Sequence, residues 1–317
     1  MVNNKKYVYF FGNKIAEGNG DLKSLLGGKG AGLAEMTRIG LPVPGGFTIT
    51  TEVCNLFFKN NNQYPDGLEE QVERNLRNLE KIVGKKLGDP EDPLLVSVRS
   101  GAPISMPGMM ETILNLGLND ASVQGLAKKT QNERFAYDAY RRFILMYSST
   151  AKNIAREKFD TIFEETKDAK TRARLGIPAD KKVADTDLNT DELKEIVEKF
   201  KAVYKNELGE DFPQDPMKQL WGAIDAVFHS WMGEKAVKYR EVEKISNIYG
   251  TAVNVVQMVF GNMGETSGTG VCFTRDPNTG ENVFYGDYLV NAQGEDVVAG
   301  IRTPMKLDEL HKKNAGL

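Results

Sequence analysis

The chain has 317 residues, and 41 Lys and Arg against 44 Asp and Glu give a formal net charge of -3 at pH 7. This near-neutral balance excludes a strongly basic nucleic-acid-binding protein. No apolar run reaches about 18 residues, so no membrane span is expected. A hydrophobic fraction of 40% and a charged fraction of 27% are typical of a soluble globular protein. The first residues lack the apolar stretch of a signal peptide, which favours a cytoplasmic protein.

The cysteines and histidines are few. Cys54 and Cys272 lie far apart and form no Cys-x-x-Cys motif, so we expect two buried, reduced thiols. The two histidines, His229 and His311, are too few for a histidine-rich metal site.

The beginning of the chain alternates between helices and strands. A glycine cluster at residues 25–32 runs into a short predicted helix over residues 33–39, which Gly40 ends. We expect a strand over residues 47–50, followed by a helix over residues 51–58.

The next segment carries a surface helix and a second strand. Apolar residues repeat at helical spacing over residues 67–85, with a polar opposite face. Residues 94–99 read as an apolar strand that ends on Arg99. A loop rich in Gly, Pro and Met follows over residues 100–110.

From about residue 120 to residue 207 the pattern is helical, with apolar stripes over residues 135–147 and 193–204. The charged stretch between these stripes, residues 166–190, contains Gly and Pro and is expected to be a solvated insertion. A further helix is predicted over residues 217–244.

The pattern after residue 249 is that of β structure. Residues 251–260 are apolar and β-branched, and a glycine-rich segment over residues 261–270 follows them. Short strands over residues 271–274, 283–285 and 288–290 predict an antiparallel meander.

These patterns predict an α+β fold with an α+β lobe at each end and a helical segment between them. We place the three parts at residues 1–118, residues 119–210 with the charged insertion, and residues 211–317.

Two positions near the start of the chain suit an anion. Residues 27–30 place glycines and Lys29 directly before a helix, where backbone amides and the helix dipole favour a phosphate. The alternative is a tight turn with a solvated lysine. Arg99 at the rim of a sheet suits a phosphate or carboxylate, or a structural salt bridge with a nearby acid.

Other candidates are less specific. Residues 264–270 form either a phosphate-covering loop or an ordinary hairpin loop, and the acids in residues 291–296 either hold Mg2+ or lie in an acidic turn. Of Arg141 and Arg142, one could face an anion, and a solvated position is expected for at least one. The methionines of residues 105–111 suit a lid, a contact with another domain, or a gap-filling core.

Several motifs together resemble one enzyme family. Residues 25–30 (LLGGKG), 40–47 (GLPVPGGF) and 97–102 (SVRSGA) resemble the start of the pyruvate, phosphate dikinase and phosphoenolpyruvate synthase group. Further segments resemble pyruvate, phosphate dikinases in particular: residues 105–117 (SMPGMMETILNLG), 134–138 (RFAYD), 264–270 (GETSGTG) and 291–300 (NAQGEDVVAG). The resemblance covers nearly the whole chain and is weakest over residues 152–185.

The resemblance implies an ATP-grasp-type nucleotide-binding domain of two α+β lobes with a helical subdomain between them. In that family ATP phosphorylates a histidine on a separate swivelling domain, and inorganic phosphate is consumed. The swivelling domain carries the phosphoryl group to a distant barrel, where pyruvate becomes phosphoenolpyruvate. AMP and diphosphate are the products from ATP.

The resemblance also implies roles for individual residues. It places Lys29 and Arg99, the expected catalytic residues, on the ATP phosphates. The remaining nucleotide-binding candidates lie on a helix, a hinge along the adenine, a glycine loop and a strand end; they are Arg142, Gln257, Met258, Val259, Thr269 and Glu295.

Several parts of the family pattern are missing from this sequence. The family's Mg2+-binding acids lie beyond Leu317, so we expect no metal ligands in this chain. The Thr-Ser-His-Ala phosphohistidine motif and the barrel are also missing, and neither histidine is expected to be phosphorylated. We therefore expect little or no phosphoryl transfer by this chain alone.

Two alternatives stay open beside the dikinase interpretation. One is a non-catalytic short form that binds nucleotide, and the other is the ATP module of a phosphoenolpyruvate synthase. The family's dimer contacts lie mainly in the barrel, so a homodimer is expected only of the parent enzyme.

Overall fold

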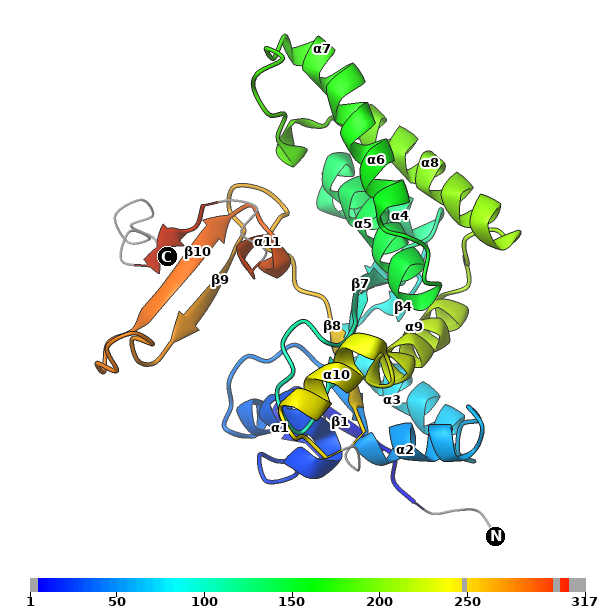
Figure 1. The fold of residues 1–317 in the computed structure, drawn as a ribbon, viewed down its shortest axis with the longest axis vertical. Helices are drawn as coiled ribbons and strands as arrows, with labels where there is room; N and C mark the ends of the chain where they lie inside the picture. Colours follow the sequence, from blue (N-terminus) through cyan, green and yellow to red (C-terminus); the bar gives the residue numbers. More distant parts are fainter. Residues whose placement is uncertain (1–4, 247–249, 299–302, 308–317) are drawn as a thin grey trace. The chain divides into compact units, whose positions relative to one another are not determined.

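Antiparallel sheets organise both parts of the chain. The computed structural model describes residues 5–246, 250–298 and 303–307 (Figure 1). The chain divides into two compact units, residues 1–258 and residues 259–317, and each contains its own antiparallel sheet beside helices. The expected mixture of helices and antiparallel strands is therefore confirmed.

The first unit is built on a six-stranded sheet in which every neighbouring pair is antiparallel. In spatial order its strands are β2 (Ile15–Ala16), β1 (Val8–Gly12), β3 (Gly46–Ile49), β8 (Ala252–Gln257), β6 (Val96–Gly101) and β7 (Thr112–Leu116). Strand β8 is the last of the six along the chain, yet it lies between β3 and β6. The apolar strand predicted over residues 251–260 thus completes the first sheet, and it does not start the later meander.

One face of this sheet is apolar and the other is partly polar. Phe47, Val98 and Val255 are paired across three strands and are fully buried. Side chains alternate along a strand, so Thr48 and Asn254 face the opposite side. Helix α1 (Lys23–Arg38) packs on that second side, and helices α3 (Leu68–Val83) and α9 (Pro216–Trp231) also contact the sheet.

Helix α1 begins earlier than predicted and ends where predicted. It starts at Lys23 and is interrupted at Gly27, so the helix expected over residues 33–39 is only its second part. At its end, the Leu41 N–H donates to the Met36 carbonyl and the Gly40 N–H to the Thr37 carbonyl. With Gly40 at φ 89°, this is the Schellman arrangement that a helix-ending glycine favours.

The other elements of the first unit include the predicted helix after residue 51 and the predicted surface helix α3. They are α2 (Thr51–Lys59), β4 (Lys86–Leu87), β5 (Pro93–Leu94), α4 (Ser122–Thr130), α5 (Glu133–Ala151), α6 (Glu157–Thr166), a π-helical turn (Lys167–Thr171), α7 (Arg172–Leu175), a 3-10 turn (Asp185–Asp187), α8 (Thr190–Leu208) and α10 (Glu234–Val242). Helices α5, α6 and α8 pack together in the helical segment (Figure 1).

The charged insertion is more ordered than expected. The Lys167 side chain is buried, and its Nζ lies 2.9 Å from carboxylate oxygens of both Glu164 and Asp185. The expectation of a solvated loop over residues 166–190 is therefore wrong for this part, because a paired lysine holds the segment against the helices.

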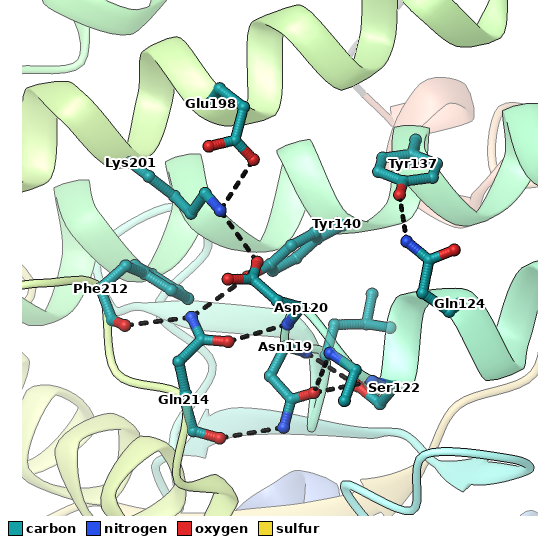
Figure 2. A network of polar contacts seen from close by, with 12 residues as sticks. Asn119, Asp120, Ser122, Gln124, Tyr137, Tyr140, Glu198, Lys201, Phe212 and Gln214 are labelled. Carbon is teal, nitrogen blue, oxygen red and sulfur yellow. Dashed lines mark hydrogen bonds and ion pairs between the residues drawn. The ribbon is translucent and has the colours of Figure 1, made fainter.

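A polar network joins the start of the helical segment to the loop before α9 (Figure 2). The Asn119 side-chain amide donates to the Gln214 carbonyl at 2.9 Å, and the Asp120 N–H donates to the Gln214 side chain at 2.8 Å. The Asp120 carboxylate also accepts hydrogen bonds from Tyr140 and Lys201, each at 2.9 Å. The network crosses the boundary expected near residue 210.

The two boundaries expected near residues 118 and 210 fall inside the first unit, whereas the observed division lies between residues 258 and 259. The three-part organisation of residues 1–118, 119–210 and 211–317 stays a prediction.

The second unit contains a three-stranded antiparallel sheet in the order β11-β10-β9, as the predicted meander requires. Its strands are β9 (Gly268–Phe273), β10 (Tyr285–Val290) and β11 (Met305–Lys306), and α11 (Gly294–Val298) follows β10. The separate short strands predicted over residues 283–285 and 288–290 are replaced by one continuous strand, β10.

The two cysteines differ in their surroundings. Cys54 is buried, as expected, and burial raises the pKa of its thiol to about 12. Cys272 on β9 is exposed, so the expectation of a second buried thiol is wrong. Both are free cysteines.

A buried ion cluster lies inside α5. The Asp138 carboxylate is 2.7 Å from Arg141 Nη2 and 3.0 Å from Arg142 Nε. Arg141 also lies over the Phe163 ring, 4.3 Å from its centroid. Burial alone would raise the pKa of the Asp138 carboxyl, but the guanidinium groups of Arg141, Arg142 and Arg134 outweigh it and hold the pKa below its usual range.

Replacing Asp138 by Asn removes the nearest counter-charge of the buried Arg141, whose other carboxylate neighbour, Asp185, lies at 3.9 Å. We expect Asp138→Asn to lower the free energy of unfolding at pH 7 by about 3 kcal/mol, measured by urea denaturation. The matched control is Asp168→Asn, which breaks an exposed pair with Arg172 and should change stability little. An equal effect of both changes would contradict this assignment.

The same cluster predicts an acid dependence of stability. The folded-state pKa of Asp138 is lowered, so its contribution is fully present above the ordinary aspartate pKa of about 4 and is lost as the pH falls below it. The difference in unfolding free energy between the wild type and Asp138→Asn should therefore shrink on acidification. Urea titrations at a series of acidic pH values measure that difference.

Candidate functional site

The glycine turn inside α1 lies against the end of strand β6. Gly27 interrupts the helix with φ 69° and ψ 168°, in the region that favours glycine. A Cβ at Gly27 would collide with the Gly101 carbonyl oxygen, and the Gly28 N–H donates to the Ala102 carbonyl at 2.9 Å. The turn thus connects the helix to the end of the strand. The Gly28 amide, which was expected to point at an anion, is used in this connection.

Lys29 and Arg99 come together at this junction. Arg99 is the one exposed residue of β6, and the strand continues beyond it to Gly101, so the expectation that it ends the strand is wrong. The Lys29 side chain is also exposed, yet the pKa of its ammonium is lowered, first by partial desolvation and then by the charge of Arg99. Two cations facing each other repel, and a bound polyanion would relieve that repulsion.

The two candidate arginines of α5 both belong to the ion cluster around Asp138. Arg142 on α5 pairs with Asp138, so its role toward a phosphate stays a prediction. The Arg141 side chain is 8% exposed and that of Arg142 15%, so the expectation that at least one of the two is solvated is wrong.

The predicted hinge coincides with the division of the chain. The Gln257 N–H donates to the Gly45 carbonyl and the Met258 N–H to the Leu95 carbonyl, each at 2.9 Å, which fixes the end of β8 in the sheet. The two units meet between Met258 and Val259, and the Val259 side chain is 69% exposed. Contact of this connection with an adenine stays a prediction.

Two candidates lie in the second unit. Thr269 was expected in a loop, but it lies in strand β9 opposite Leu289, because Gly268–Phe273 pairs along its whole length with β10. Its Oγ1 lies 3.7 Å from the position of a Cβ on Gly294, at the start of α11. Glu295 is part of α11, but its side chain lies outside the described residues.

The acids expected in a turn or at a magnesium site over residues 291–296 lie in α11, and one of them has a structural use. The Asp296 carboxylate accepts a hydrogen bond from the Gln293 N–H at 2.9 Å and is buried. Across residues 5–246, 250–298 and 303–307, no three Asp, Glu, His or Cys side chains are grouped so that they could hold a metal ion. Within the same ranges, no helix is both long enough and apolar enough to cross a bilayer.

One residue beside the cations was missed by the sequence analysis. Asn254 on β8 is 1% exposed, and its Oδ1 accepts a hydrogen bond from Thr48 Oγ1 at 2.9 Å. Its backbone pairs with that of Arg99. The available signal was an amide in the middle of an apolar, β-branched strand, between Val253 and Val255.

The turn geometry predicts opposite effects for two glycine substitutions in α1. Gly27→Ala should lower the free energy of unfolding by about 2 kcal/mol or more, because alanine is strained at this φ and its Cβ meets the Gly101 backbone. Gly32→Ala is the control, since its Cβ would meet nothing within 4 Å, and it should stabilise the helix slightly. Urea denaturation of both variants tests this, and a neutral Gly27→Ala would contradict the turn.

Comparison with known proteins identifies the family. Residues 23–81 and 61–314 match the family model described as "Pyruvate phosphate dikinase, AMP/ATP-binding domain". The chain is 55% identical over 306 residues to the pyruvate, phosphate dikinase of Clostridium symbiosum, covering 96% of this chain and 33% of that protein. It is 55% identical over 296 residues to the Entamoeba histolytica enzyme of the same name, covering 93% of this chain and 32% of that protein.

A plant protein is similar over the same region. The chloroplastic pyruvate, phosphate dikinase 1 of Arabidopsis thaliana is 53% identical over 308 residues, covering 97% of this chain and 31% of that protein. The chain thus spans about a third of the length of the curated relatives it matches. By its match over nearly its whole length, the chain belongs to the pyruvate, phosphate dikinase family, as the AMP/ATP-binding domain.

Proposed function

We propose that this chain binds the phosphates of ATP through Lys29 and Arg99. The observation that carries this proposal is the pair of cations brought together by the Gly27 turn and strand β6, in a chain of an AMP/ATP-binding family. Membership of the family alone supports nucleotide binding. The structure adds two candidate groups for the phosphates, the Lys29 ammonium and the Arg99 guanidinium.

We further propose that the two units act as the two lobes of an ATP-grasp fold. The adenine would lie along Gln257, Met258 and Val259, because the chain passes there from one unit to the other. Arg142 from the first unit, and Thr269 and Glu295 from the second, are the remaining proposed nucleotide-binding residues.

The proposed reaction belongs to a longer parent protein. There, the phosphoryl group of bound ATP would pass to a histidine of a swivelling domain, in the overall conversion of ATP, phosphate and pyruvate to AMP, diphosphate and phosphoenolpyruvate. Enzymes of phosphoryl transfer act mainly by positioning and by charge stabilisation. Lys29 and Arg99 would orient the phosphates and offset their charge, and they form no covalent bond with them.

Mg2+ accompanies ATP in this proposal, but the described residues do not fit a magnesium site of their own. The buried Asp296 carboxylate is engaged with the Gln293 N–H, and no acidic cluster is present in the described part of the chain. We therefore propose that the chain alone binds nucleotide and transfers little or no phosphate.

The alternatives are separated by what the parent protein consumes. A phosphoenolpyruvate synthase module would not require inorganic phosphate as co-substrate, whereas a pyruvate, phosphate dikinase would. A non-catalytic short form would bind nucleotide and support no reaction with a swivelling domain. The homodimeric parent and the cytoplasmic location stay proposals.

Calorimetric titration with Mg·ATP tests nucleotide binding directly. We expect saturable binding by the 317-residue chain. Arg99→Ala and Lys29→Ala should each weaken the affinity by about tenfold or more, because each removes one phosphate-facing charge. Arg77→Ala is the matched control, since Arg77 is an exposed arginine of α3 paired with Glu73. Saturable binding that neither variant weakens would exclude this site, and no binding by a folded wild type would exclude nucleotide binding by this chain.

A further inference from the structure

A row of polar side chains crosses the sheet beneath helix α1. Thr48 on β3, Asn254 on β8 and Arg99 on β6 are direct partners in the strand register. Residues directly opposite each other in antiparallel strands project to the same face. Two members of the row, Thr48 and Asn254, are almost completely buried, while Arg99 is exposed.

Helix α1 approaches this row through its glycines. A Cβ on Gly30 would lie 2.8 Å from Thr48 Cγ2 and 2.9 Å from Asn254 Oδ1. A Cβ on Gly101 would lie 2.5 Å from Asn254 Nδ2 and 3.7 Å from Lys29 Cβ. The Asn254 amide is therefore packed between the helical turn that carries Lys29 and the end of the strand that carries Arg99.

The hydrogen bonds of this amide are asymmetric. Oδ1 accepts from the Thr48 hydroxyl, which fixes the orientation of the side chain. Nδ2 is buried and has no hydrogen-bond partner among the described residues. An unpartnered buried donor costs free energy, and leucine or valine would fill the same space in an apolar strand without that cost. The amide thus calls for an explanation other than core packing.

We infer that Asn254 is a positioning residue of the proposed phosphate site, where it sets the separation between Lys29 on α1 and Arg99 on β6. This inference rests on the proposed function for its ligand, ATP, but its structural part concerns the two cations alone. Asn254 acts on the phosphates through Lys29 and Arg99, and it touches neither ATP nor a reacting atom.

Two measurements on Asn254→Ala test the inference. NMR titration of the Lys29 side chain without nucleotide should show its pKa rising toward the ordinary lysine value, because the helix turn is no longer held where Lys29 is partly desolvated and lies close to Arg99. Calorimetry should show Mg·ATP binding weakened about tenfold. Thr48→Val, which keeps the side-chain shape and removes the hydrogen bond to Asn254, should move both quantities in the same direction by less.

Asn75→Ala is the matched control. Asn75 is a buried asparagine on α3 whose side chain donates to the Gln71 carbonyl, so its loss should lower stability without reaching the cations. A change in the Lys29 pKa as large in Asn75→Ala as in Asn254→Ala would overturn the inference, because general destabilisation would then explain it.

The remaining outcomes separate the two proposals. If folded Asn254→Ala keeps the wild-type Lys29 pKa and ATP affinity, the positioning role is wrong while nucleotide binding stands. If the wild type fails to bind ATP but Asn254→Ala moves the Lys29 pKa, the positioning role is supported and the proposed function fails. If Asn254→Ala does not fold, Thr48→Val decides, and unchanged values in that variant would overturn the role.

Discussion

The close approach of helix α1 to strand β6 is the constraint on which the proposed site depends. Gly27 turns the backbone against Gly101, and Gly30 lets the helix rest on Thr48 and Asn254. Larger residues at these positions would push the helix away from the sheet. Because the backbones are this close, Lys29 lies near enough to Arg99 for the charge of Arg99 to disfavour its ammonium, beside partial desolvation. The packing of glycines therefore creates an electrostatic cost that an anion can offset.

Two groups of charged side chains in the first unit differ in how their charges are arranged. In α5, the Asp138 carboxylate forms ion pairs with both Arg141 and Arg142. At the glycine turn, Lys29 lies near Arg99, and partial desolvation together with the charge of Arg99 lowers the pKa of the Lys29 ammonium. The first arrangement stabilises the fold, whereas the second is suited to a ligand with negative charge. This contrast is why the phosphate contacts are proposed first for Lys29 and Arg99, with Arg142, which is paired with Asp138, as a further candidate.

Strand β8 links the fold to the proposed site. It enters the sheet between β3 and β6 only after the long helical segment, so the sheet is completed by residues far along the sequence. Its middle supplies Asn254 beneath α1, and its end leads to the connection at Met258 and Val259. One strand thus supports the cations and begins the passage to the second unit.

The sequence by itself determined the local elements and the family-specific cations. The Gly40 helix end, strand β3, helix α3 and the antiparallel strands of the second unit all follow from periodicity and capping, which act over a few residues. Lys29 and Arg99 were recognised because a glycine cluster and a lone charge at a strand are local patterns.

Only the tertiary structure decided which distant residues meet. It placed β8 in the first sheet and Thr269 within a strand, and it used the Gly28 amide for a contact with Ala102. It also buried Asn254 between helix α1, which carries Lys29, and the end of strand β6, which carries Arg99. The residues next to Asn254 in the sequence do not predict this position. The physical reason is that strand register and helix-to-sheet distance are set by contacts between residues far apart along the chain, and local patterns carry no information about those distances.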